Sequence, residues 1–199
     1  MTFPTIIVLE KSEFVNMRKT HIMLCAICGL FILSACQDFA NRREIVKKLY
    51  KFKSAEFKLP DSLIRLNQGL RDTVSNFLSN DNKTLVIFCG PDDCPSCVID
   101  HIREFDSLYD LAFEMEDMEV MFIFSPHYYD RENVMNRLNS LDVQNPVFLD
   151  YKGEMYLKNN IPSDPRFHIF VLDENGIPIF VGNPAQSEKA KKVFLKQIS

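Results

Sequence analysis

Short apolar runs alternate with helix-like stretches through the middle of the chain. The runs are Leu85–Cys89, Glu119–Phe124 and Pro146–Asp150. Each run leads through a polar turn into apolar residues at helical spacing, which predicts helices from Cys94 onward, over Asp130–Leu141 and around Glu154–Asn159. The first helix would carry on one face Val98, Ile102, Phe105 and Leu108. Because unbroken apolar strands followed by helices are typical of parallel sheets buried on both faces, we predict an α/β fold.

Two further apolar runs close the chain, His168–Leu172 and Ile177–Val181. The Asn-Gly pair within Asp173–Gly176 is a strong hairpin signal, so these runs are expected to be antiparallel neighbours. Pro178 has no N–H to donate, which places the last strand at a sheet edge. An amphipathic helix is predicted over about Ser187–Ile198.

The segment before the first apolar run carries a weaker pattern. Glu56–Pro60 alternates polar and apolar residues, which predicts a short edge strand. The next apolar residues recur at helical spacing and predict a helix, although Gly69 weakens that prediction. They are Leu63, Leu66, Leu70, Val74 and Phe77.

The N-terminal region has the pattern of an export signal. Arg18-Lys19 precede an apolar stretch, Ile22–Ala35, that is short for a membrane span. Leu33-Ser34-Ala35-Cys36 resembles the bacterial lipobox, which implies cleavage before Cys36 and lipid on that thiol. The alternative is an uncleaved N-terminal anchor helix. Either arrangement places the mature domain outside the cytoplasm, in the cell envelope.

These features divide the chain into three parts. We expect a signal peptide over 1–35, a lipidated Cys36 with a tether over 36–55, and one domain over 56–199. Acidic residues precede the basic pair, so our hypothesis is that translation starts at Met17. The basic run after Cys36 could contact anionic headgroups, but a solvated tether accounts for it as well.

Composition excludes several classes of function. The formal net charge of -4 over 199 residues gives no basic footprint for nucleic acid. Six cysteines are too few and too unevenly placed for a disulfide-stapled miniprotein, and Cys25 and Cys28 fall in the leader. A structural zinc site needs four ligands, and the domain has no second cysteine pair, so we expect no metal or other cofactor.

The remaining cysteine pair, Cys94 and Cys97, follows the first core strand and a Gly-Pro turn and opens a helix. A thiol at a helix start is stabilised as the thiolate by free backbone N–H groups, and the thiolate is the species that attacks disulfides. Cys94 is therefore the candidate nucleophile, and Cys97, one turn on, the candidate resolving thiol. Asp93 is expected to cap the helix. The alternative is a structural or inert pair.

The order of elements resembles the thioredoxin fold. In this fold class, a central mixed sheet is closed by a C-terminal β-hairpin and helix, and the extra strand and helix at Pro146–Asn159 resemble the insertion of TlpA/ResA-type reductases. Ile161–His168 and Gly182-Asn183-Pro184 are similar to segments of lipid-anchored thioredoxin-like proteins from Bacteroidetes. The resemblance implies a thiol–disulfide oxidoreductase, with the reductant direction favoured, acting on protein thiols and disulfides and served by a membrane electron donor.

Some positions depart from the thioredoxin pattern. A cis-Pro is expected just before the penultimate strand, but Phe167 stands there and Pro165 lies two residues earlier. Either the strand is longer and Pro165 takes that role, or the cis-Pro is lost. The usual Trp before the cysteine pair is replaced by Asp92-Asp93.

The histidines offer further candidate site residues, and two other classes of protein have to be considered. His101 could stabilise a thiolate or lie on the surface, and His127 could line a groove beside the cysteine pair. His168 is expected to pack at its strand start. A peroxiredoxin would have Thr or Ser where Pro91 stands. A second alternative is a non-catalytic binding module in which the Cys94–Cys97 disulfide is structural.

Overall fold

The computed structural model describes residues 41–67, 70–75, 82–141 and 143–198. The predicted signal peptide, the proposed start at Met17, the lipidation site Cys36 and the helix residue Phe77 lie outside these ranges. Two compact units are present, and the second, Lys48–Ser199, contains the sheet and the cysteine pair. Among the described residues, no helix combines the length and apolar character needed to cross a membrane.

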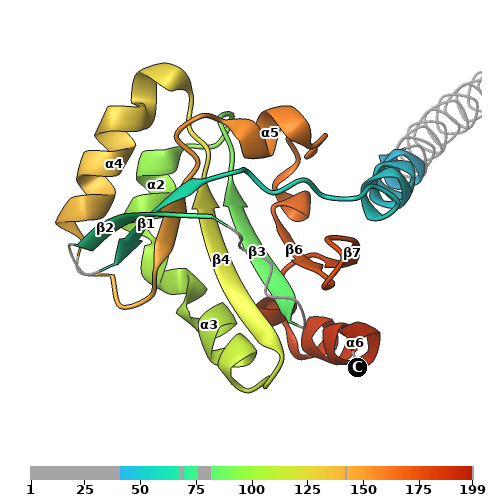
Figure 1. Cartoon of the computed structure of the whole chain (residues 1–199). Helices are drawn as coiled ribbons and strands as arrows, with labels where there is room; N and C mark the ends of the chain where they lie inside the picture. The colour runs from blue at the N-terminus through green and yellow to red at the C-terminus, as the bar shows by residue number, and fades with distance from the viewer. Residues whose placement is uncertain (1–40, 68–69, 76–81, 142, 199) are drawn as a thin grey trace, which may run out of the picture. The chain divides into compact units, whose positions relative to one another are not determined.

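A seven-stranded mixed sheet forms the centre of the second unit, in the order β2-β1-β5-β4-β3-β6-β7 (Figure 1). The strands are β1 (Leu63–Asn67), β2 (Leu70–Val74), β3 (Lys83–Cys89), β4 (Met118–Phe124), β5 (Val147–Leu149), β6 (Ile169–Leu172) and β7 (Pro178–Val181). β3, β4 and β5 are mutually parallel neighbours, whereas β6 runs antiparallel to both β3 and β7. The predicted parallel core and edge position of the last strand are confirmed.

Helices connect these strands. They are α2 (Pro95–Asp100), α3 (Asp106–Phe113), α4 (Arg131–Ser140), α5 (Glu154–Lys158) and α6 (Glu188–Ile198), with 3₁₀ turns η1 (Ile102–Phe105), η2 (Tyr128–Asp130), η3 (Pro165–Phe167) and η4 (Pro184–Gln186). The single helix expected from Cys94 through Leu108 is instead divided into α2, η1 and α3. The backbone leaves helical geometry at His101, where φ is -110° and ψ is 19°.

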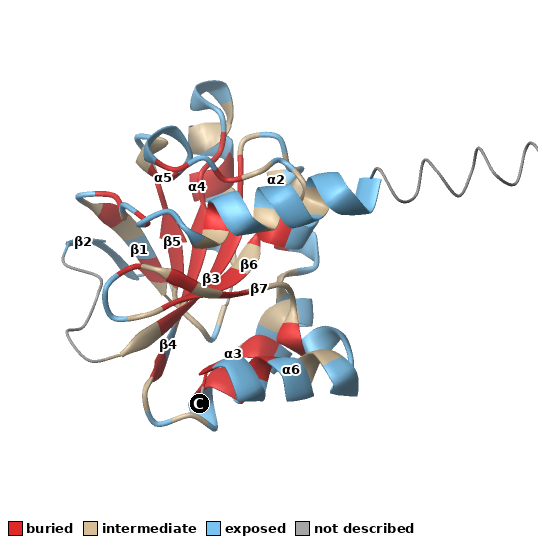
Figure 2. Ribbon diagram, turned by 90° about the vertical axis from the view of Figure 1, so that its right-hand side faces the viewer, coloured by how far each residue is buried: buried red, intermediate tan, exposed pale blue. Residues whose placement is uncertain are grey.

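The sheet is buried on both faces, as its apolar strands predict (Figure 2). Leu85, Ile87 and Cys89 of β3 point into one core, which they share with α3, α4 and α6. The intervening Val86 and Phe88 are also buried and face the other side. There, edge-to-face rings form a second core, in which Phe52 and Phe57 contact Phe170 at centroid distances of 5.2 and 4.8 Å.

The helix expected from Leu63 onward is wrong, because Leu63–Asn67 and Leu70–Val74 form the antiparallel strands β1 and β2. β1 pairs with β5 and so satisfies that strand's open edge with backbone hydrogen bonds. Leu63 and Leu66 are buried, but Leu70, which the helical pattern needs on the same face, is 74% exposed. The helical spacing of these residues was coincidental.

The edge strand expected over Glu56–Pro60 does not form either. The Phe57 N–H donates to the Gly176 carbonyl over 2.9 Å, and the Lys58 N–H donates to Asn159 Oδ1 over 2.8 Å. A loop carbonyl and a side chain thus replace a neighbouring strand as partners. In the β6–β7 connection, Gly176 adopts φ 77°, the left-handed conformation that the predicted hairpin turn requires.

Candidate functional site

The cysteine pair lies at the end of the sheet to which β3 and β4 both point (Figure 1). The register pairs Cys89 with Phe124, so the loops that follow the two strands start side by side. The Ser125 N–H donates to the Cys89 carbonyl over 2.8 Å and fixes the loops together. As predicted, His127 is brought to the cysteine side of the sheet, with its Nε2 atom 4.0 Å from Asp92 Oδ1.

Cys94 and Cys97 form a disulfide with a Cα–Cα distance of 5.3 Å. Cys94 is the N-cap of α2, and the backbone N–H of Cys97 points at its Sγ atom over 3.3 Å. Both cysteines are exposed. Accessibility therefore does not separate attacking from resolving sulfur, whereas the N–H directed at Cys94 favours a thiolate at that position.

Asp93 does not cap α2, and the expected cap role is wrong. Its Oδ2 atom accepts a hydrogen bond from the Gly90 N–H over 2.6 Å and lies 3.1 Å from Nδ1 of His168. These contacts turn the carboxylate back toward β3 and away from the helix. The cap position falls to Cys94 itself.

His168 is buried just before β6, as expected. It also pairs with an acidic side chain, which the sequence did not indicate. Its Nδ1–H donates to Asp93, and its Nε2–H donates to the Pro162 carbonyl over 2.9 Å. Burial alone would lower the pKa of His168, but the hydrogen bond and charge of Asp93, with Pro162 and Asp164, outweigh it and raise the pKa. Both ring nitrogens thus face acceptors beside the Gly90–Cys94 turn, an arrangement that favours the protonated ring.

Cys89, the third cysteine of the domain, is a buried apolar residue of β3, as expected. Burial raises the pKa of its thiol strongly, and the charge of Asp93 adds to the effect. A neutral buried thiol is a poor nucleophile. Among the cysteines that the structure describes, only Cys94 and Cys97 therefore present sulfur atoms suited to exchange.

Pro165 begins the η3 turn and does not extend β6. All peptide bonds between described residues are trans. His168 occupies the position just before β6, and its carbonyl accepts the Phe88 N–H over 2.7 Å. The segment facing the cysteine loop thus presents His168 and Pro162 in place of a cis-Pro.

His101 lies on the surface. Its Nδ1 atom is 3.0 Å from Glu104 Oε1, and its side chain is 67% exposed. This arrangement matches the surface alternative of the two roles considered for it. Within the described parts of the chain, no three His, Cys, Asp or Glu residues cluster in a way that could hold a metal ion.

The strand arrangement around the cysteine pair decides the fold class. A β3–α–β4 unit pairs through β3 with an antiparallel β6–β7 hairpin, and β5 with α5 is inserted beside β4. The fold is thioredoxin-like. With a Cys-x-x-Cys disulfide at the β3–α2 junction, it is the fold of thiol–disulfide oxidoreductases.

Comparisons with known proteins give only distant matches. No protein-family model matches the sequence, and neither does any curated protein. A solved thioredoxin-like protein from Bacteroides caccae aligns with a TM-score of 0.42 and 14% identity over 78% of this chain and 55% of its own. An uncharacterized thioredoxin-like protein from Porphyromonas gingivalis aligns with a TM-score of 0.42 and 15% identity, over 70% of this chain and 89% of its own. Mycobacterium tuberculosis AhpC aligns with a TM-score of 0.42 and 20% identity, over 68% of this chain and 92% of its own.

Proposed function

We propose that the protein is a thiol–disulfide oxidoreductase that acts outside the cytoplasm. The observation that carries this proposal is the exposed Cys94–Cys97 disulfide at the start of α2, with the Cys97 N–H directed at Cys94 Sγ. A buried structural bridge would not present both sulfurs to a partner protein.

In the reductive direction, the Cys94 thiolate attacks one sulfur of a substrate disulfide and releases the other as a thiolate, which takes up a proton. The Cys97 thiolate then attacks Cys94 Sγ and releases the second substrate thiol. The substrate gains two electrons and the Cys94–Cys97 dithiol loses two. A dithiol donor at the membrane restores the pair by the same exchange in reverse.

The lipobox-like Leu33–Cys36 segment supports a lipid anchor on Cys36 and a place in the cell envelope. The partners would then be thiols and disulfides of exported proteins. Cells grown with a labelled fatty acid should incorporate the label into the wild-type protein, and replacing Cys36 by Ala should abolish the incorporation. Label that persists in the variant would contradict a lipid on Cys36.

Mixed-disulfide trapping tests the exchange chemistry. Cys97→Ser removes the resolving thiol, so Cys94 should accumulate in reductant-sensitive complexes with envelope proteins. Cys94→Ser is the matched control, which leaves one thiol of the same pair and should capture far less. If neither variant captures partners and the disulfide resists reduction until the domain unfolds, the protein is instead a binding module with a structural disulfide.

A further inference from the structure

A pocket of about 190 Å³ opens beside the cysteine loop. Its wall includes Pro91, three residues before Cys94, and it continues over the β4–α4 loop and the start of α5. The residues that shape it are Pro91, Ser125, Tyr128, Arg131, Lys152 and Tyr156. Nothing in the exchange mechanism above uses the charged members of this set.

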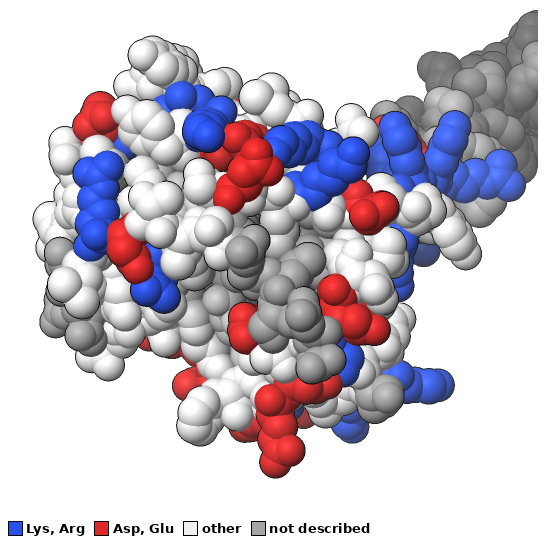
Figure 3. Space-filling view, in the orientation of Figure 1, with Lys and Arg blue, Asp and Glu red and all other residues white. Residues whose placement is uncertain are grey.

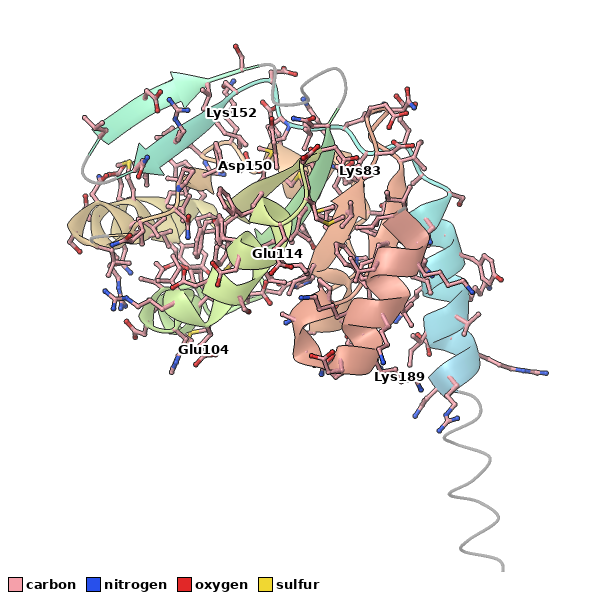
Figure 4. The ribbon with its side chains drawn as sticks, turned by 90° about the horizontal axis from the view of Figure 1, so that it is seen from below. Lys83, Glu104, Glu114, Asp150, Lys152 and Lys189 are labelled. Carbon is pink, nitrogen blue, oxygen red and sulfur yellow. A yellow bond between two sulfur atoms is a disulfide. The ribbon has the colours of Figure 1, made fainter. Side chains whose placement is uncertain are left out.

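Buried Asp150 holds the pocket wall in place. Its carboxylate accepts from Ser125 Oγ over 2.9 Å and from the backbone N–H groups of Glu154 and Met155 over 3.0 and 2.7 Å. The loop after β5 is thereby fixed to the loop after β4. Figure 4 shows Asp150 and Lys152 together at this loop.

Arg131 is the feature that calls for a ligand. Its guanidinium lies over the Tyr128 ring at 4.9 Å and near the Tyr151 ring at 5.5 Å. Its Nε atom is buried, and no hydrogen-bond partner reaches that atom from the described part of the chain. The two rings hold the guanidinium at the wall of the pocket, where its terminal N–H groups can pair with a planar anion.

Two carboxylates near the pocket, those of Glu132 and Glu154, are already engaged. Glu132, the neighbour of Arg131 in α4, accepts the Tyr151 hydroxyl over 2.7 Å. Glu154 accepts from Lys158 over 2.8 Å, with Lys152 3.6 Å away. Figure 3 shows basic and acidic side chains adjoining one another over the position of α5. Asp92, at the cysteine end, faces His127.

The surface around the pocket suits a peptide. Tyr128 and Leu157 are 79% and 77% exposed, and Tyr156 is 40% exposed. Exposed aromatic side chains beside an arginine are typical of sites that bind polypeptide. The occupant that matches both the unpartnered guanidinium and this apolar rim is an extended acidic segment.

We propose that this pocket binds a carboxylate side chain of the substrate segment that carries the reacting cysteine. The protein would then prefer disulfides flanked by acidic residues, with Arg131 and Lys152 as specificity-determining residues. The proposal rests on the exchange function proposed above and names its substrate class.

Single-turnover oxidation of the reduced full chain tests this. Two model peptide disulfides are compared that differ only in Glu against Gln near the cysteine. A charge-assisted hydrogen bond at a half-buried arginine predicts about tenfold faster reaction with the Glu peptide, a ratio that corresponds to about 1.4 kcal/mol. Arg131→Gln should bring the ratio of the two rates close to one, mainly by slowing the reaction with the Glu peptide.

Two further variants keep the result interpretable. Lys152→Gln, at a 64% exposed side chain, should lower the ratio without a folding defect. Arg137→Gln is the control, because Arg137 lies on the same helix but pairs with Asp100, and the ratio should persist. Equal rates with the two peptides in the wild type, or a preference that survives Arg131→Gln, would overturn the acidic-substrate proposal alone. Failure of both peptides to oxidise the protein would overturn the exchange function instead.

Discussion

Replacing His168 by Ala removes the side chain that joins the start of β6 to Asp93, next to the cysteine pair. The side chains of His168 and Asp93 are only 10% and 18% exposed, so solvent screens their interaction weakly. The variant leaves the Asp93 carboxylate with the Gly90 N–H alone, and it deletes the edge-to-face contact with Phe88 at 5.5 Å.

The magnitude follows from these two contacts. A hydrogen bond to a charged group contributes about 1.5–3 kcal/mol and an edge-to-face ring pair about 0.5–1.5 kcal/mol, so His168→Ala should lower the free energy of unfolding by about 2–4 kcal/mol in mild acid.

The loss should depend on pH. The folded pKa of His168 is raised above its unfolded value, so its stabilisation is fully present below about pH 6.5 and is lost as pH rises through the folded pKa. Near pH 9 the neutral ring has one N–H and can keep only one of its two hydrogen bonds, so the difference between wild type and variant should shrink by about 1 kcal/mol.

Urea unfolding with the disulfide intact measures the loss of unfolding free energy at about pH 6 and at about pH 9. Unchanged m-values check that unfolding remains two-state. His101→Ala is the matched control, since its exposed ring should contribute less than about 0.5 kcal/mol at either pH. A His168→Ala loss that is equal at the two pH values would refute the charged pair with Asp93.

Two further substitutions and one labelling experiment test the packing around the cysteine pair. Phe170→Ala, at a fully buried ring of the second core, should lower the free energy of unfolding by about 3–5 kcal/mol in the same assay. Gly90→Ala would place a Cβ 2.8 Å from the Phe88 ring and should cost about 1–3 kcal/mol; an unchanged stability would show that the turn adapts. In the native reduced protein, Cys94 and Cys97 should react with iodoacetamide while Cys89 reacts only after unfolding, as mass spectrometry of peptides would show.

The sequence predicted the elements whose signal is local and strong. Leu85–Cys89 and Glu119–Phe124 are continuous apolar runs. Such short runs are best explained as strands that are buried on both faces of a sheet. The cysteine pair was located for the same reason, since it directly follows the first run.

The errors arose where a partner distant in the sequence decides the outcome. β1 and β2 form a hairpin because β1 completes the edge of β5, a strand distant in the sequence. The register pairs Leu66 with Val147, 81 residues later. Asp93 is no helix cap because His168, which only the folded sheet brings near, pairs with it.

The arginine pocket could not be found from spacing either. Arg131 has an ordinary position in an amphipathic helix, and its unsatisfied Nε atom becomes visible only when Tyr128 and Tyr151 are placed around it.

The most direct test of the exchange function is a redox titration of the Cys94–Cys97 pair in the folded full chain against glutathione or dithiothreitol buffers. The account predicts reversible two-electron behaviour, with a potential between about -120 and -270 mV, the range of known exchange proteins, while the fold stays intact. A pair that stays oxidised until the domain unfolds would contradict it.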